Sequence, residues 1–271
     1  MRPLFAALPS LVDKIRQADE VALFLDYDGT LTPLRERPEQ ARLSGQARGL
    51  LRDLARRPGI WVALVSGRAL SDVKRMAGVR RLCYVGNHGL QVEGSGIRYT
   101  LRQAAASRPV MREIARRLRR ELAMIPGAWV EDKNLTLAVH FRQVEPGEKI
   151  LVRNLFHAIL RPYLEKGKVR VTAGKEVLEV RPPIRWTKGT MVRWLLARRI
   201  GLRPEGKILP IYVGDDLTDE DAFSALDRRG ITVVVGRSNL FSKAQYRVAS
   251  PAAVLRFLRL LLSFRRGKSA A

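Results

Sequence analysis

The feature that most constrains the fold is a series of short apolar runs, each followed by polar residues and then by a helical pattern. Residues 21–25, 60–65 and 208–213 are such runs. Strands that are apolar along their whole length are typical of parallel sheets covered by helices on both faces. The alternation of strands and helices therefore predicts an α/β fold with a Rossmann-like parallel-sheet core.

The middle of the chain follows a different pattern. Between residues 135 and 141, apolar positions alternate with Thr136, Ala138 and His140, which is typical of an antiparallel strand with one solvent face. We expect four such strands, a long basic helix over residues 104–124 and a second helix over 146–160. These elements predict an inserted α/β domain at residues 93–182, between two parts of a core domain at residues 1–92 and 183–271.

Composition excludes several classes of protein. Hydrophobic residues make up 46% of the 271 positions, and no apolar run approaches the roughly 18 residues of a membrane span. Helical spacing over residues 4–15 predicts an amphipathic helix rather than a signal peptide. The only cysteine, Cys83, allows no internal disulfide and favours a reducing, cytoplasmic location. We expect no membrane partner.

The net charge of +24 points to acidic partners such as nucleic acid, anionic membranes or phosphorylated metabolites. The arginines are spread along the chain, and the clusters at residues 116–120 and 265–268 are short. No aromatic residues are interleaved with them to stack on bases. An arginine-rich solvated surface is therefore the favoured interpretation, and no specific nucleic-acid partner is expected. A polyanion-binding protein remains the remote alternative.

Four polar clusters follow expected strands or begin a helix. Ligands of open α/β sheets bind beyond the carboxyl ends of the strands, so these clusters form the candidate site. They are Asp26 and Asp28 with Gly29, which permits a bend; Ser66, Gly67 and Arg68; Lys188; and residues 214–221, which contain five carboxylates.

The carboxylates of these clusters suggest a metal and a reaction. Acidic side chains held this closely would repel one another without a cation, and Mg²⁺ accepts both carboxylate and phosphate oxygens. An aspartate at such a site can attack phosphorus to form an aspartyl-phosphate, which water then hydrolyses. Lys188 would offset part of the negative charge. The expected reaction is therefore phosphoryl transfer.

These clusters resemble the motifs of the haloacid dehalogenase phosphatase superfamily, at residues 26–30, Ser66, Lys188 and residues 214–219. A closer resemblance is to the trehalose-6-phosphate phosphatase family. It is carried by residues 25–33, 65–68, 86–89 and 214–223, and by residues 131–133, 138–142 and 174–182 of the insert. The resemblance covers roughly residues 21–262 and implies a hydrolase core with an α/β cap domain that determines substrate specificity.

The resemblance also implies roles for residues of the core. Asp26 would be the nucleophile and a metal ligand. Asp28 would be the general acid and then the general base, and its backbone carbonyl would bind the metal. Asp215 would be a second carboxylate ligand, supported by Asp216 or Asp219. Ser66 and Lys188 would hold the transferring phosphoryl group.

In the insert, the resemblance implies that Glu131, Lys133 and Glu179 hydrogen-bond the hydroxyl groups of the sugar. Further candidates for substrate binding are Gly67, Arg68, Asn87, His88, Gly89, His140, Arg142 and Lys175. For His88 and His140 a purely structural role remains an open alternative.

The expected activity is Mg²⁺-dependent hydrolysis of trehalose 6-phosphate, the last step of trehalose biosynthesis, with a functional link to a separate trehalose-6-phosphate synthase. Mn²⁺ or Co²⁺ could substitute, because the ligands would be oxygens in every case. The alternative within the superfamily is a phosphatase for another sugar phosphate, such as sucrose 6-phosphate or mannosyl-3-phosphoglycerate.

Overall fold

A computed structural model of the chain describes residues 1–271 apart from 36–37, 175, 203, 205, 237–240 and 266–271. The chain divides into two compact units, which we call the core unit and the insert unit. The core unit comprises Met1–Tyr99 and Trp186–Ala271, and the insert unit comprises Thr100–Arg185.

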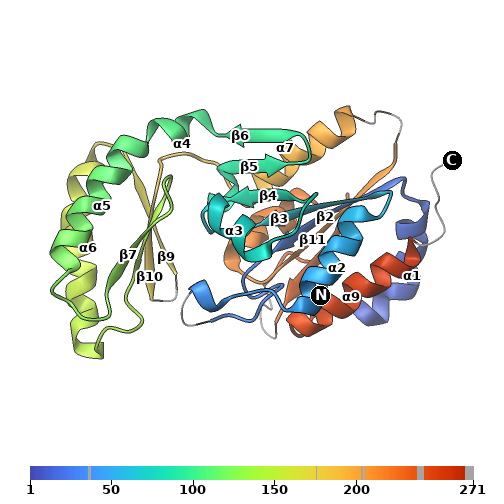
Figure 1. Ribbon diagram of the computed structural model, residues 1–271, viewed down its shortest axis with the longest axis horizontal. Coiled ribbons are helices and arrows are strands. Elements are labelled where there is room, and N and C mark those ends of the chain that lie inside the picture. Colours follow the sequence, from blue (N-terminus) through green and yellow to red (C-terminus); the bar gives the residue numbers. More distant parts are fainter. Residues whose placement is uncertain (36–37, 175, 203, 205, 237–240, 266–271) are drawn as a thin grey trace. The chain divides into compact units, whose positions relative to one another are not determined.

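The core unit is built on a nine-stranded sheet, counted over the described residues, in the order β1-β13-β12-β11-β2-β3-β4-β5-β6 (Figure 1). From β1 to β4 every neighbouring pair is parallel, whereas β5 is antiparallel to β4. The strands are β1 (Arg2–Pro3), β2 (Glu20–Asp26), β3 (Ile60–Val65), β4 (Cys83–Gly86), β5 (Gln91–Gly94), β6 (Ile97–Thr100), β11 (Ile208–Gly214), β12 (Ile231–Val235) and β13 (Tyr246–Val248). The predicted parallel-sheet core is confirmed.

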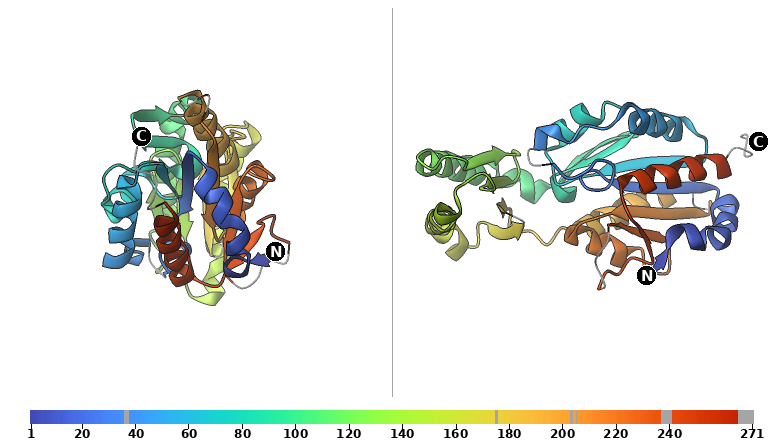
Figure 2. Two further views of the ribbon diagram at one scale, coloured as in Figure 1. Left: turned by 90° about the vertical axis from the view of Figure 1, so that its right-hand side faces the viewer. Right: turned by 90° about the horizontal axis from the view of Figure 1, so that it is seen from below.

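Helices cover both faces of this sheet, as Figure 2 shows from two further directions. Along β2, the side chains of Val21, Leu23 and Leu25 join one hydrophobic core, and those of Ala22 and Phe24 join the other. The first core lies under α1 (Leu4–Gln17), α2 (Gly45–Arg56), α3 (Leu70–Ala77) and α9 (Pro251–Phe264). The second lies under α7 (Lys188–Gly201) and α8 (Glu220–Ala225). Burial on both faces explains why β2 is apolar at successive positions.

The insert unit is a four-stranded antiparallel sheet with helices packed on one face. Its strands follow the order β7-β8-β10-β9 and are β7 (Trp129–Asp132), β8 (Leu137–His140), β9 (Arg170–Gly174) and β10 (Val177–Arg181). Leu137 and Val139 pack into a separate hydrophobic core with α5 (Arg108–Leu122) and α6 (Lys149–Glu165). The expected alternation along β8 is therefore present.

The structure differs from the expected boundaries in two places. Residues 93–99 were expected at the start of the insert, but they belong to the core unit, where β5 pairs with β4 and extends the core sheet. The expected long helix is divided into α4 (Arg102–Ala106) and α5 at Ser107. Pro109, which follows the break, has no backbone N–H to donate, so it is tolerated only in the first turn of the new helix.

Four short 3₁₀ helices complete the described elements: η1 (Pro38–Gln40), η2 (Asn87–Gly89), η3 (Pro146–Glu148) and η4 (Leu217–Asp219). Of these, η2 directly follows β4, and η4 follows β11 after residues 215–216. Among the described helices, none is both long and apolar enough to cross a membrane.

Candidate active site

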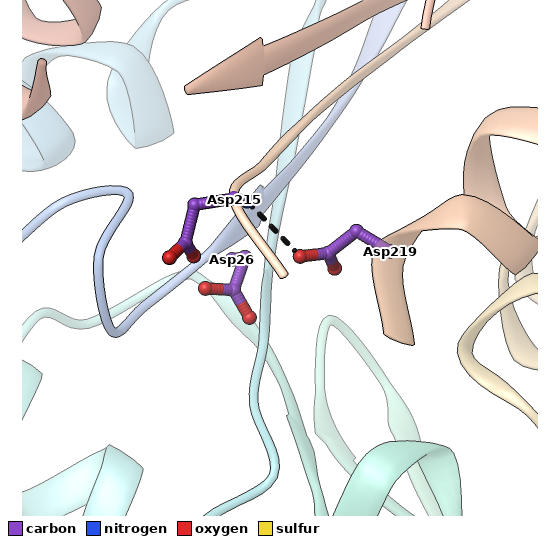
Figure 3. Close-up of side chains that lie close together, drawn as sticks. All are labelled: Asp26, Asp215 and Asp219. Atoms are coloured by element: carbon purple, nitrogen blue, oxygen red, sulfur yellow. Dashed lines mark hydrogen bonds between the residues drawn. The ribbon is translucent and has the colours of Figure 1, made fainter. Parts of the chain in front are cut away.

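Three carboxylates gather at the carboxyl edge of the core sheet. Asp26 is the last residue of β2, and Asp215 follows the last residue of the neighbouring strand β11. Because the two strands are parallel, their carboxyl ends lie together. Asp219, at the end of η4, completes the group shown in Figure 3. One oxygen from each of the three carboxylates lies within 4.8 Å of the other two.

Lys188 lies against two of these carboxylates. Its Nζ donates hydrogen bonds of 2.7 Å to Asp26 Oδ1 and 2.7 Å to Asp219 Oδ1. Lys188 is the first residue of α7, and the Thr187 side chain caps that helix by accepting from Thr190 N. The exposed fractions are 3% for Lys188, 5% for Asp26 and 0% for Asp219. One buried ammonium group thus pairs with two members of a group of three carboxylates, which leaves an excess of negative charge.

Burial and the neighbouring charges shift the pKa values of the cluster. Burial raises the pKa of Asp26 well above its usual range; Lys188 opposes the rise, and Asp219 and Asp215 add to it. Burial, together with the charge of Asp219, raises the pKa of Asp215 to about 7. Burial alone would lower the pKa of Lys188, but Asp219 and Asp26 outweigh it and the pKa lies above its usual value. Both aspartates would gain from a further cation.

Asp219 also organises the loop that follows β11. Its Oδ2 accepts hydrogen bonds from the backbone N–H groups of Asp215 at 3.1 Å and Asp216 at 3.0 Å. Its Oδ1 accepts from Tyr212 Oη at 2.6 Å in addition to Lys188. All of these donors converge on one fully buried carboxylate, so the position of Asp215 beside Asp26 depends on it.

Asp216, which we expected among the metal ligands, lies outside the group of three carboxylates. It is exposed, and its side chain accepts hydrogen bonds from Leu217 N at 2.7 Å and Thr218 Oγ1 at 3.3 Å. Asp216 and Asp219 form a capping box at the start of η4. The structure therefore brings Asp219, rather than its neighbour Asp216, to Asp26 and Asp215.

The turn after β2 is fitted closely against Asp215. Gly29 has a φ of +76°, and a Cβ atom there would lie 1.9 Å from Asp215 Oδ2. Any other residue would collide with the carboxylate and would also be strained by the left-handed backbone. Thr30 Oγ1 donates to Asp215 Oδ1 at 3.2 Å. The turn after β2 thus holds the Asp215 carboxylate in place.

Asp28 is paired with an arginine from the next strand end. Arg68 Nε donates to Asp28 Oδ2 at 2.7 Å, and Arg68 Nη2 donates to Asp28 Oδ1 at 2.6 Å. The two side chains form a bidentate ion pair in which the exposed fraction is 11% for Arg68 and 32% for Asp28. Arg68 was expected to bind substrate, and the structure shows that it binds Asp28.

Ser66 is buried at the end of β3 and takes part in the same loop. Its Oγ accepts from Arg68 N at 3.1 Å, and its backbone carbonyl accepts from His88 N at 3.0 Å. Gly67 faces the imidazole of His88 so closely that a Cβ atom at Gly67 would lie 2.5 Å from His88 Cε1. The loops after β3 and β4 are therefore packed together.

The loop after β4 has an unusual backbone. Asn87 and His88 have φ values of +51° and +55°, which non-glycine residues rarely adopt. Asn87 Nδ2 donates to Gln91 Oε1 at 3.0 Å, and Trp186 Nε1 donates to the Gly89 carbonyl at 2.9 Å. Such strain is characteristic of functional loops, although these contacts are internal to the protein.

The insert unit has its own polar cluster on the sheet face opposite its helices. Lys133 Nζ donates to Glu179 Oε1 at 3.0 Å and lies 3.9 Å from Glu131 Oε2. His140 Nε2 lies 2.8 Å from the same Glu131 oxygen, and the ring of His140 stacks on Trp129 with centroids 4.1 Å apart. The structure thus brings together four residues that were predicted from sequence.

Strand register explains this cluster. Glu131 on β7 and Glu179 on β10 both lie opposite Ala138 of the intervening strand β8. Directly paired residues point to the same face of a sheet, so the two carboxylates flank the small Ala138 side chain. Arg181 Nε donates to Glu179 Oε2 at 2.9 Å. Sequence reasoning missed Arg181, although its place two residues after Glu179 puts it on the same face.

The remaining predicted residues of the insert are placed differently. Arg142 Nε lies 3.5 Å from Glu176 Oε2, and Glu176 also pairs with Lys149. Lys175 lies outside the described residues.

Comparison with known proteins shows which family the chain is similar to. A profile of the family described as Trehalose-phosphatase matches residues 24–252. Trehalose-phosphate phosphatase B of Arabidopsis thaliana is 32% identical over 97% of this chain and 72% of its own length. Probable trehalose-phosphate phosphatase 4 of Oryza sativa subsp. japonica is 34% identical over 93% and 68%, respectively. The C-terminal domain of the Candida albicans trehalose-6-phosphate phosphatase has a TM-score of 0.78 and 26% identity, covering 94% of this chain and 96% of that one.

The parallel sheet with a carboxylate cluster at its carboxyl edge, and the α/β insert, define a capped protein of the haloacid dehalogenase superfamily. Within that superfamily, the chain belongs to the trehalose-phosphatase family.

Proposed function

We propose that this protein is a Mg²⁺-dependent phosphatase that hydrolyses trehalose 6-phosphate to trehalose and phosphate. The observation that carries the proposal is the position of Asp26, which lies beside Asp215 and Asp219 and accepts a hydrogen bond from Lys188. A carboxylate in this setting is a nucleophile with cationic groups arranged around the phosphoryl group that it attacks. The names of the relatives support the choice of substrate.

The residues present fit a magnesium ion. The donors are carboxylate oxygens, which Mg²⁺ prefers. Burial, with the neighbouring carboxylates adding to it, raises the pKa values of Asp26 and Asp215, so a bound cation would stabilise their ionised forms. Asp26, Asp215 and the backbone carbonyl of Asp28 would hold the ion. Asp219 already accepts four hydrogen bonds, so its role would be to position Asp215. The exposed Asp216 would support the site through the turn that it caps. When bound, Mg²⁺ supplies charge stabilisation for the phosphoryl oxygens; Mn²⁺ or Co²⁺ would fit the same oxygens.

The reaction has two displacements at phosphorus. A carboxylate oxygen of Asp26 attacks phosphorus and the bond to the sugar oxygen breaks, while Asp28 donates a proton to that oxygen. Asp28 then accepts a proton from water, the water oxygen attacks phosphorus, and the bond to Asp26 breaks to release phosphate. Throughout, Lys188 Nζ and the Ser66 hydroxyl donate hydrogen bonds to phosphoryl oxygens.

The polar face of the insert unit suits a neutral sugar. Glu131 and Glu179 carry negative charge, and Lys133 and Arg181 carry positive charge, so charges within the cluster are nearly balanced. Hydroxyl groups can both donate to carboxylates and accept from cations. A carboxylated substrate such as mannosyl-3-phosphoglycerate would find no net positive charge there, which favours trehalose over that alternative.

The remaining predicted contacts are part of the proposal. Gly67, Asn87, His88, Gly89, Arg142, Lys175 and His140 stay candidates for substrate binding. The stacking of His140 on Trp129 and its bond to Glu131 support a positioning role for it. The link to a separate synthase and the cytoplasmic location also remain predictions.

Phosphate release from a panel of substrates tests the proposal. The panel contains trehalose 6-phosphate, sucrose 6-phosphate, glucose 6-phosphate and mannosyl-3-phosphoglycerate, each with Mg²⁺ and with EDTA. We expect Mg²⁺-dependent release from trehalose 6-phosphate and little from the others. Preference for another member of the panel would keep the phosphatase chemistry and reject the assigned sugar.

A matched pair of variants tests the insert unit. Glu179→Gln should raise the KM for trehalose 6-phosphate at least about tenfold, because it removes a charged acceptor of sugar hydroxyls. Glu113→Gln, on the outer surface of α5, is the control and should leave KM unchanged. Equal KM values for the two variants would contradict the assignment of Glu179.

A further inference from the structure

We propose that Arg68 is a positioning residue that acts through Asp28, holding the carboxylate of the acid–base residue in a fixed plane. The proposal rests on the proposed phosphatase function and assigns Arg68 neither to the phosphate nor to the sugar. It starts from the bidentate pair, in which two nitrogens of one guanidinium group donate to the two oxygens of one carboxylate. Such paired hydrogen bonds fix direction as well as distance.

Arg68 is itself held on a rigid support. Its backbone N–H donates to Ser66 Oγ at 3.1 Å, and its backbone carbonyl accepts from Asn87 N at 2.7 Å. Its guanidinium carbon lies 5.7 Å from the centroid of the Tyr27 ring. Tyr27 is buried, and its hydroxyl donates to the Ala41 carbonyl at 2.9 Å. Asp28 is therefore clamped to a side chain with an anchored backbone that lies near a fixed ring.

The pairing constrains how Asp28 can react. Each of its oxygens accepts one hydrogen bond from Arg68 in the structure, and each keeps a second lone pair that can exchange a proton with a substrate atom. The bidentate pair fixes the plane of the carboxylate and therefore the directions in which these free lone pairs point. A lysine could supply the charge but not the planar fork that sets this orientation.

Arg68 has two alternative roles, which kinetics and inhibition by free trehalose together separate from positioning. As a direct phosphate ligand it would stabilise the transferring group of every phosphate ester equally. As a sugar ligand it would affect only substrates that carry the sugar. As a positioning residue for Asp28, it matters when the leaving oxygen needs a proton, which a sugar alkoxide does and a nitrophenolate does not.

The leaving-group dependence of Arg68→Met therefore tests the proposal. The value of kcat/KM reports on the steps up to leaving-group departure, so later hydrolysis of the phosphorylated enzyme does not enter it. We expect kcat/KM to fall about 100-fold for trehalose 6-phosphate. For p-nitrophenyl phosphate it should stay within about threefold of the wild-type value. Equal losses for both esters would overturn the proposal in favour of a phosphate ligand.

Further variants separate orientation from charge and from misfolding. Arg68→Lys should stay impaired on trehalose 6-phosphate, and full recovery would overturn the proposal. In an Asp28→Asn background, Arg68→Met should cause no further loss of kcat/KM, because its effect passes through Asp28; an additive loss would contradict this. A raised inhibition constant for free trehalose in Arg68→Met would instead indicate a sugar contact.

Two controls complete the experiment. Arg75→Met removes an exposed arginine that pairs with Asp72 on α3, and it should match the wild type on both esters. Thermal unfolding of Arg68→Met, followed by circular dichroism, should be a cooperative transition like that of the wild type. If the wild type does not hydrolyse trehalose 6-phosphate, the proposed function fails at that step, and any other alkyl phosphate that it hydrolyses serves to test Arg68 independently.

Discussion

The site depends on individual carboxylates with different tasks. Asp26 and Asp215 present oxygens to a common space, whereas Asp219 uses its oxygens on Lys188, Tyr212 and two backbone N–H groups. Asp216 lies three residues before Asp219 but is exposed and caps a turn. Burial and donor supply, rather than residue type, separate these roles.

Asp219→Asn and Asp216→Asn form a matched pair of variants. In the first, the amide nitrogen of asparagine would face donors that now bind a carboxylate oxygen, and Lys188 would lose one of its two partners. We expect a loss of about 3 kcal/mol in the free energy of unfolding. Asp216→Asn should cost under about 1 kcal/mol. Urea unfolding measures both, and similar losses would contradict the distinct roles.

Cys83 is predicted to be chemically inert in the folded protein. The residue is fully buried in β4, and burial raises the pKa of its thiol to about 12. Below that pH the thiol stays neutral, so at pH 8 only about one molecule in 10⁴ carries the reactive thiolate. Iodoacetamide at pH 8 should modify the protein only after denaturation. Modification of the native protein at the rate of the unfolded chain would show that Cys83 is accessible.

At the scale of elements, the site is made by strand ends and by the first turn of α7. β2 and β11 deliver Asp26 and Asp215, and α7 begins at Lys188. The position of Lys188 depends on close packing between α7 and α8. A Cβ atom at Gly189 would lie 2.2 Å from the backbone carbonyl oxygen of Asp221.

Two glycines of α7 give opposite predictions. Gly189→Ala must push α7 and α8 apart, so we expect a loss of about 2 kcal/mol in unfolding free energy and a large loss of activity through Lys188. Gly201→Ala, at the other end of the same helix, meets no atom within 4 Å and should raise stability by up to about 1 kcal/mol. Thermal unfolding and phosphate release measure both; a stable, active Gly189→Ala would refute the packing argument.

Sequence patterns predicted most elements, and what they missed has physical causes. The central strands were clear because burial on both faces makes them apolar throughout. Strands β1 and β13 were missed because strands of only two or three residues leave no periodicity to detect. The break at Ser107 was missed because the apolar spacing continues from α4 into α5.

The candidate site was also predictable in part. Strand-end positions identified Asp26, Asp28, Ser66 and Asp215, because parallel strands end at one edge of the sheet. The choice between Asp216 and Asp219 required the course of the loop after β11, which no local pattern encodes. The pairing of Asp28 with Arg68 joins residues 40 positions apart. Such a contact depends on side-chain geometry and was not foreseen.

The whole molecule consists of two units with separate hydrophobic cores. The insert unit contributes Phe141, Phe156 and Leu160 to a core of its own. Its chain is continuous from Thr100 to Arg185, whereas the core unit is assembled from two segments. A continuous segment with its own core satisfies the requirements for independent folding.

Residues 100–185 are therefore expected to fold when expressed alone. The fragment should show a cooperative thermal transition by circular dichroism, and Phe156→Ala should destabilise it by about 3–5 kcal/mol, since this ring is fully buried. A non-cooperative melt of the unaltered fragment would show that its core depends on the rest of the chain.

The most direct test of the account is to trap the phosphorylated enzyme during turnover. The protein is mixed with trehalose 6-phosphate and Mg²⁺, quenched in acid, and treated with borohydride, which reduces an aspartyl-phosphate to homoserine. Peptide mass spectrometry should then find homoserine at position 26, and none in Asp26→Asn or in EDTA. Release of phosphate from trehalose 6-phosphate without this change, or with the change at another aspartate, would contradict the assignment of Asp26 as the nucleophile.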